Sequence, residues 1–207
     1  MENTANQITL VGTLETMPEF SHSNHERRFY RLMLAVPRLS GAVDHLPVLA
    51  AEDVLMQAEL FAGERFLVTG QIRSFNSRQL TGRRLILCVY ACAITTTDRA
   101  PENSAVLTGT LCKEPVYRRT PLGREIADLM LAVPRLYRRT DYIPCIAWGR
   151  NAQLCAPLPA GTELTLTGRM QSREYVKIID GESFTRTAYE LSVSECALPE
   201  LCPDGAF

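Results

Sequence analysis

The sequence lacks the signatures of the common enzyme classes. It has no Gly-x-Ser-x-Gly elbow, no glycine-rich phosphate-binding loop and no His-Glu-x-x-His motif, so nothing indicates a hydrolase, a nucleotide-binding enzyme or a zinc protease. We therefore predict no catalytic residue and no cofactor. The net charge of -1 also excludes a globally basic protein, so any site for a polyanion must come from local clusters of arginine and lysine.

Metal and disulfide chemistry are also poorly supported. The seven cysteines are odd in number and include no Cys-x-x-Cys pair, which predicts buried, reduced thiols rather than a disulfide framework or a zinc cage. Cys92 and Cys196 fall in matching Cys-Ala-aliphatic triplets, which suits small core residues. His22 and His25 stand beside Glu26 in what reads as a polar loop, but no further ligand has the spacing of a metal site.

The chain also lacks a basic N-terminal region followed by an apolar stretch, and its longest apolar run, Leu85 to Ile94, is too short to cross a bilayer. We therefore expect no contact with a membrane and a cytoplasmic, nucleoid-associated protein.

What the sequence does contain is an internal repeat. Leu32 to Leu39 reads Leu-Met-Leu-Ala-Val-Pro-Arg-Leu, and the same eight residues return 97 positions later at Leu129 to Leu136. The repeat predicts two copies of one unit, at 1–98 and 103–207. The polar segment Thr95 to Asn103 joins them and is too short to let the copies move far apart.

Each copy carries the pattern of a small β-barrel. Ile8, Leu10 and Leu14 alternate with polar residues as in a strand, and Gly12 and Gly109 suggest a bend at a barrel corner. The expected strands of the two copies are Ile8 to Leu14 and Ala105 to Leu111, Tyr30 to Val36 and Ile126 to Val133, Leu46 to Ala50 and Tyr142 to Trp148, Arg65 to Ile72 and Glu163 to Met170, Arg84 to Ile94 and Thr187 to Leu198. Asp180-Gly181 marks a hairpin turn.

A short amphipathic helix is expected between the third and fourth strands. Val54, Leu55, Ala58 and Phe61 have helical spacing, and the counterpart in copy two, Asn151 to Ala156, is expected to be shorter. Five strands with one such helix is the order of the OB-fold, so we predict an all-β protein of two tandem five-stranded OB-fold barrels.

The two copies differ most in their aromatic residues. Alternation on the third strand of copy two places Ile143, Cys145 and Ala147 toward the core and Tyr142 and Trp148 on the opposite face. Copy one has His45 and Ala51 at those two positions. Two further tyrosines of copy two also correspond to serines in copy one, Tyr137 to Ser40 and Tyr175 to Ser77.

Cations are dense around these four aromatic positions. The cations are Arg118, Arg119, Arg124, Arg138, Arg139, Arg150, Arg169, Arg173 and Lys177, against Arg27, Arg28, Arg73, Arg78, Arg83 and Arg84 in copy one. Aromatic rings that stack on unpaired bases, with arginines that contact phosphates, are what single-stranded nucleic acid requires. On the residues alone, a purely structural role has about equal weight, because a Trp or Tyr on a strand is more often a core residue and loop arginines are usually solvated.

The motifs of copy two resemble the bacterial single-stranded-DNA-binding protein family. The resemblance rests, in order, on Gly109-Thr-Leu-Cys-Lys-Glu-Pro, Arg119-Thr-Pro-Leu-Gly-Arg-Glu-Ile, Leu131-Ala-Val-Pro-Arg, Asp141-Tyr-Ile-Pro-Cys-Ile-Ala-Trp-Gly-Arg, Gly168-Arg-Met-Gln-Ser-Arg-Glu-Tyr and Thr187-Ala-Tyr-Glu-Leu. It covers nearly all of copy two. Copy one follows more loosely, at Gly12, Leu34-Ala-Val-Pro-Arg and Gly70-Gln-Ile-Arg-Ser.

The resemblance implies an OB-fold that binds single strands without catalysis in DNA replication, repair or recombination. It implies base stacking at Tyr137, Tyr142, Trp148 and Tyr175, and phosphate contacts from Arg118, Arg119, Arg138, Arg139, Arg150, Arg169, Arg173 and Lys177. The family usually assembles four OB-folds, which implies a homodimer here. The family often has tryptophan at the three tyrosine positions and a polar residue at Pro134. Its long acidic tail is missing, and Asp204-Gly-Ala-Phe207 is a weak match to the tip that docks replication or repair proteins.

Two questions remain open from the sequence. Copy one could be a structural partner, or it could offer a weaker DNA surface that uses Phe75, Arg73 and Arg78. The rival for the whole chain is an OB-fold adaptor in a replication or phage assembly whose face binds a polypeptide.

Overall fold

The computed structural model describes residues 5–79, 82–179 and 182–199, without the side chains of 77–79, 82–84, 177 and 179. Several expected features therefore lie outside the described residues: the Asp180-Gly181 turn, Cys202, the tip at 204–207 and the side chains of Ser77, Arg78, Arg83, Arg84 and Lys177.

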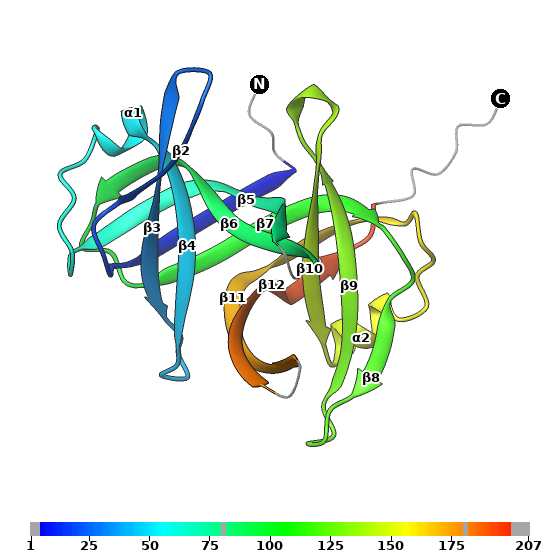
Figure 1. Ribbon diagram of the computed structural model, residues 1–207. Coiled ribbons are helices and arrows are strands. Elements are labelled where there is room, and N and C mark those ends of the chain that lie inside the picture. Colours follow the sequence, from blue (N-terminus) through cyan, green and yellow to red (C-terminus); the bar gives the residue numbers. More distant parts are fainter. Residues whose placement is uncertain (1–4, 80–81, 180–181, 200–207) are drawn as a thin grey trace.

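The two copies are two β-barrels that lie side by side (Figure 1). Copy one contains β1 (Asn6–Leu14), β2 (Glu19–Asn24), β3 (Arg27–Pro37), β4 (Val43–Ala51), α1 (Glu52–Leu55), β5 (Arg65–Gln79) and β6 (Gly82–Thr96). Copy two contains β7 (Glu102–Leu111), β8 (Val116–Arg119), β9 (Glu125–Pro134), the 3-10 turn η1 (Leu136–Arg138), β10 (Thr140–Trp148), α2 (Arg150–Cys155), β11 (Glu163–Ile179) and β12 (Glu182–Ala197).

Each barrel closes through its first strand. In copy one, β1 pairs with β5 along most of its length and with β3 at Thr13 and Leu14, while β4 runs parallel to β6. Copy two repeats these pairings. The bend in β1 brings Gly12 against the carbonyl of Ala35, where a Cβ atom would be only 2.6 Å from the oxygen. This is the OB-fold topology, so the predicted fold class is confirmed, and Gly12 has the corner role that its position in the strand indicated.

The structure corrects three local expectations. The region of His22 and His25 is not a polar loop, because β2 pairs with β3 there as an added hairpin, and β8 pairs with β9 in the same way. The helix of copy two is the longer one, with six residues in α2 against four in α1. Phe61 is 55% exposed and lies beyond the end of α1. Its helical spacing from Val54 therefore does not reflect a shared helix.

The linker is also shorter than expected. Strand β6 continues to Thr96 and β7 begins at Glu102, so residues 97–101 alone connect the copies. Asn103 is not part of a loop. Its side-chain amide donates to the carbonyl of Met170 at 2.7 Å and its side-chain oxygen accepts the Met170 amide at 3.0 Å. Asn6 in copy one makes the same two bonds with Ile72.

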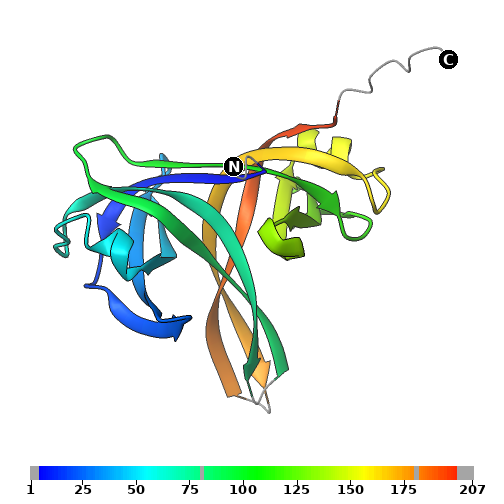
Figure 2. The ribbon, with the colours of Figure 1, turned by 90° about the horizontal axis from the view of Figure 1, so that it is seen from above.

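The two barrels share one continuous sheet. Strand β1 pairs antiparallel with β7 from Asn6 to Val11, so twelve strands of the described chain follow one another across both copies. Figure 2 shows β1 and β7 running together along one side, while the β5–β6 and β11–β12 hairpins project together on the other. Among the described residues, the larger of two buried apolar clusters accordingly includes residues of both barrels, and the smaller one contains Phe29, Leu49, Ala51 and Cys88 of copy one.

Two buried carboxylates cross the boundary on the side of the hairpins. Asp141 of copy two is 0% exposed and accepts from Arg135 of its own copy and from Arg73 of copy one, both at 3.0 Å. The backbone amide of Ser74 also donates to it. Asp44 of copy one is 1% exposed and is shared in the same way by Arg38 and by Arg169 of copy two. Each copy therefore holds the long hairpin of the other.

The cysteines only partly follow the expectation of buried thiols. Cys88, Cys145 and Cys155 are buried, but Cys92 and Cys112 are exposed and Cys196 is half-buried. Thr69 pairs with Ala93 and Gly70 with Ala91, so Cys92 is the extra residue of a β-bulge. The bulge of copy two falls at Ser194, so the matching triplets around Cys92 and Cys196 are out of structural register.

The carboxylate links predict a stability effect. We expect Asp141→Ala to lower the free energy of unfolding by about 3 kcal/mol, because two largely buried guanidinium groups lose their shared partner. Asp128→Ala, which removes an exposed ion pair with Arg118, should cost less than about 1 kcal/mol. Urea unfolding followed by circular dichroism measures both; equal losses would mean that Asp141 does not hold the copies together.

The cysteine environments predict selective alkylation. Burial raises the pKa of Cys88 to about 12, and burial also raises the pKa of Cys145, so neither supplies thiolate near neutral pH. Iodoacetamide should modify Cys92 in the native protein and reach Cys88 and Cys145 only after unfolding. Peptide mass mapping tests this, and rapid native modification of Cys145 would contradict the described core.

Candidate nucleic-acid interface

Trp148 lies in a groove at the boundary between the copies. It is the last residue of β10 and is half-buried, and its Nε1 donates to Ser192 Oγ in β12 at 3.1 Å. The groove has a volume of about 450 Å³. Its lining residues are Arg38, Arg124, Trp148, Arg169, Gln171, Ser172, Arg173 and Ser192. One indole and four arginines are thus brought together, and Arg38 comes from copy one.

The groove carries net positive charge. Arg38 and Arg169 share the single carboxylate of Asp44, which leaves one charge uncompensated. The hydrogen bond to Asp44 raises the pKa of Arg38, whereas burial and the neighbouring Arg38 lower the pKa of Arg169. Arg173 has only a long contact of 3.9 Å with Glu190. An anion placed between these guanidinium groups would relieve their desolvation and mutual repulsion.

Arg124 adds a further charge at the mouth of the groove. It is exposed and forms no ion pair within the part of the chain that the structure describes. It lies in the turn between β8 and β9, where its amide donates to Thr120 Oγ1 at 3.1 Å. Arg124 is therefore free to contact a phosphate.

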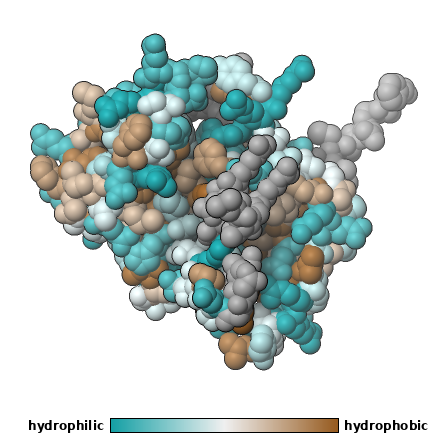
Figure 3. Space-filling model, in the orientation of Figure 1, coloured by the Kyte–Doolittle hydropathy of each residue, from teal (hydrophilic) through white to brown (hydrophobic). Residues whose placement is uncertain are grey.

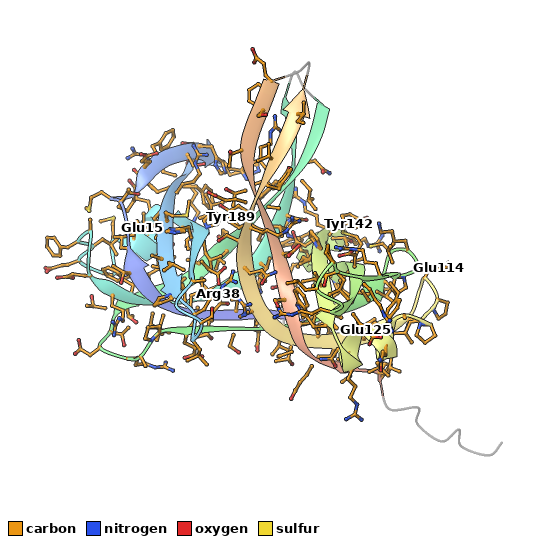
Figure 4. The ribbon with its side chains drawn as sticks, turned by 90° about the horizontal axis from the view of Figure 1, so that it is seen from below. Glu15, Arg38, Glu114, Glu125, Tyr142 and Tyr189 are labelled. Atoms are coloured by element: carbon orange, nitrogen blue, oxygen red, sulfur yellow. The ribbon has the colours of Figure 1, made fainter. Side chains whose placement is uncertain are left out.

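Tyr142 is at the other end of β10. The six residue steps from Tyr142 to Trp148 span about 20 Å of strand, and Tyr142 is 47% exposed. Its backbone amide donates to Ser74 Oγ of copy one at 2.8 Å. Tyr142 therefore borders β5 of copy one rather than the groove of Trp148. Figure 4 shows it on the copy-two barrel, with Arg38 where the two copies meet.

Tyr137 stands alone on a hairpin tip. It lies in η1 between β9 and β10 and is 92% exposed. Tyr137 and Arg138 both have positive φ angles, of 60° and 56°, a conformation that is unfavourable for bulky residues. Copy one has Gly41 at the position of Arg138. Arg138 and Arg139 are both exposed beside Tyr137.

Tyr175 is on the β11–β12 hairpin and is not among the lining residues of the Trp148 groove. It pairs with Arg186 across the hairpin, and the Arg173 guanidinium lies 5.9 Å from its ring centre. Lys177 is in β11, with a side chain outside the described residues. The four predicted aromatics thus form a discontinuous path on copy two, not one compact site.

The remaining predicted arginines differ in how free their charges are. Arg118 makes two hydrogen bonds to Asp128, at 2.7 and 3.2 Å, and Arg119 bonds Glu125 at 3.0 Å. Arg150 begins α2 and is exposed, next to Leu154 and Cys196 rather than Trp148. The predicted phosphate contacts are therefore of two kinds. Arg118, Arg119, Arg169 and Arg173 have acidic partners, whereas Arg138, Arg139 and Arg150 form no ion pair within the described residues.

Sequence comparison missed Arg38. It lies inside the repeated octapeptide, so its presence in both copies indicated a role in the fold. It has that role through Asp44, but it also lines the groove of Trp148. Only the cross-boundary geometry shows this, and no local pattern around Arg38 does.

Within the described ranges, no group of three or more histidine, cysteine or acidic side chains could hold a metal ion, and His22 stacks on Phe29 at 4.9 Å instead. No helix in the part of the chain that the structure describes is long and apolar enough to cross a membrane.

The fold and this groove define a tandem OB-fold protein with an aromatic and cationic surface. Over 98% of the chain, it is similar to the wild-type single-stranded DNA binding protein from Thermus aquaticus, with a TM-score of 0.78, 22% identity and 96% of that chain covered. At this identity the likeness establishes the fold.

Sequence comparison relates the second copy to a known family. Residues 102–198 match the model of the single-strand binding protein family. An 80-residue match is 39% identical to single-stranded DNA-binding protein A of Bacillus subtilis, covering 35% of this chain and 46% of that protein. Single-stranded DNA-binding protein 3 of Clostridium acetobutylicum is 35% identical over 80 residues, covering 35% of this chain and 56% of that protein. The chain spans about half the length of these curated relatives. The match to the single-strand binding protein family lies in the second copy.

Proposed function

We propose that this protein binds single-stranded DNA without sequence preference and without catalysis. The observation that carries the proposal is the boundary groove, in which Trp148 is surrounded by four arginines from both copies. A base would stack on the indole, and the guanidinium groups would contact the flanking phosphates. Neither half of the interaction needs a particular base, because every base has a π-face.

The strand would continue over the other aromatic positions of copy two. Tyr142, Tyr137 and Tyr175 are spread around the barrel, so a bound strand would wrap the surface rather than enter a single pocket. Its phosphates would be met by Arg138, Arg139, Arg150, Arg169 and Arg173, with Arg118, Arg119 and Lys177 at the edges. Because copy two is similar to this family, the proposed role of the protein is in DNA replication, repair or recombination.

We further propose a homodimer that brings four OB-folds together in the cytoplasm, on the nucleoid. One chain supplies two barrels fixed to each other by the β1–β7 pairing, so two chains would complete the set. Figure 3 shows a face on which hydrophilic and hydrophobic residues are interspersed.

The first test uses the only tryptophan in the sequence. A thymine oligomer of about thirty nucleotides, the length that two OB-folds cover, should quench Trp148 emission at low salt, and added salt should reverse the quenching. Absence of binding by the folded protein at low salt would reject single-strand binding and favour the adaptor function.

The indole itself is tested by Trp148→Ala and Trp148→Phe. We expect Trp148→Ala to weaken binding about tenfold, because one base stacked on an aromatic ring contributes on the order of 1 to 3 kcal/mol to the binding free energy. Trp148→Phe retains a ring and should lose less. Fluorescence anisotropy of a labelled oligomer gives both affinities; an unchanged affinity for Trp148→Ala would place the strand elsewhere.

The charges are tested by comparing two arginines of copy two. Arg124→Gln should lower affinity and reduce the slope of log K against log salt by about one, because an unpaired cation is removed. Arg118→Gln, in which the arginine is already paired with Asp128, should change the slope less. If the two variants behave alike, the ion pairing seen on the β8–β9 hairpin does not matter for binding.

A further inference from the structure

Copy one has an aromatic ring, Tyr90, at the place in its barrel that Trp148 occupies in copy two. Alignment of the two sequences does not show this, because the residue aligned with Trp148 is not aromatic. In copy two, Trp148 at the end of β10 lies against Ser192 in β12. In copy one, the position of Trp148 is Ala51 and the position of Ser192 is Tyr90, because Leu49 pairs with Tyr90 as Ile146 pairs with Ser192. Tyr90 packs against a buried cluster that contains Ala51. The large and the small residue have exchanged strands, so a ring occupies the same place.

The surroundings of Tyr90 repeat those of Trp148. The Arg73 guanidinium lies 5.8 Å from the Tyr90 ring centre, and Phe29 lies 6.4 Å from it. Arg27 stands at the position of Arg124 and lies 5.8 Å from the Phe29 ring centre. Phe29 is buried beneath Tyr90, so copy one offers the ring of Tyr90 beside the Arg73 guanidinium on the equivalent face of its barrel.

Copy two completes this face, as copy one completes the groove of Trp148. Arg135 is the counterpart of Arg38 in the repeated octapeptide and lies 6.0 Å from the ring centre of Phe75. Phe75 is 40% exposed and follows Ser74, which accepts the amide of Tyr142. Two exposed rings, Phe75 and Tyr142, therefore border the boundary here. Arg73 and Arg135 share the carboxylate of Asp141, which leaves one positive charge.

We propose that this face, defined by Arg73, Phe75, Tyr90 and Arg135, is a second contact site for single-stranded DNA in which Tyr90 replaces the ring of Trp148. The proposal rests on single-strand binding by the protein as a whole. A strand leaving the groove of Trp148 could pass along β10 by way of Tyr142 and reach Tyr90 in the other barrel.

The acidic residues beside this face reduce the number of free positive charges on it. Asp53 makes a bidentate bond to Arg27 and Glu52 bonds Arg28, where copy two has Arg150 and Gly149. Fewer cations are therefore free than around Trp148. The second site should bind mainly by stacking, more weakly than the first, and with little dependence on salt.

The test compares oligomers of about fifteen and about thirty thymines, since one OB-fold covers roughly 4 to 16 nucleotides. Tyr90→Leu should weaken binding of the longer oligomer about tenfold, which corresponds to one lost stacking contact, and change binding of the shorter one by less than about twofold. Tyr90→Phe, which keeps a ring, should restore the wild-type affinity. Phe61→Leu removes an exposed ring of copy one outside this face and is the matched control.

Two readouts separate the possible failures. Trp148 emission and the urea midpoint show whether Tyr90→Leu disturbs the fold; a loss that Tyr90→Phe does not restore would reject stacking on this ring. If Tyr90→Leu and Phe61→Leu both bind like the wild type at both lengths, the second site is wrong while single-strand binding stands. If the wild-type protein binds neither oligomer, the proposed function itself fails.

Discussion

Two buried carboxylates, each shared by one arginine from either copy, fix the geometry on which the binding surface depends. Asp44 and Asp141 are almost completely inaccessible to water, and an unpaired charge in that position would be costly. Together with the β1–β7 pairing, they make the tandem repeat a single body with a defined boundary. Both candidate binding faces lie along that boundary and take one arginine from the opposite copy, Arg38 in one and Arg135 in the other.

The two copies differ in two ways: copy one lacks some aromatic residues of copy two, and some equivalent residues have exchanged positions between the copies. Copy one has Gln71 and Arg73 where copy two has Arg169 and Gln171, yet both arginines reach the carboxylate of the other copy. In the same way, Tyr90 and Ala51 correspond to Ser192 and Trp148. Residues two apart on one strand, or opposite each other on neighbouring strands, lie within about one side-chain length, so a function can move between such positions without leaving its place in the fold.

Much of the fold could be predicted from the sequence, because the repeat and the period-2 patterns are strong signals in each copy. Gly12 and Gly109 marked the barrel corners, and the alternation of Ile143, Cys145 and Ala147 correctly identified the core face. The strands β2 and β8 were missed because their residues are almost entirely exposed and carry no alternation. For the candidate site, the sequence indicated the residues of copy two but not their separation into a groove, a hairpin tip and a second face, which depends on the pairing of strands far apart in the chain.

The most direct test of the account is photocrosslinking of the full chain to a thymine oligomer carrying 5-iododeoxyuridine, followed by mass mapping of the modified peptides. The account predicts crosslinks at Trp148 in copy two and at Tyr90 in copy one, with competition by unlabelled single strands but not by duplex. Crosslinks confined to residues away from the boundary between the copies would contradict it.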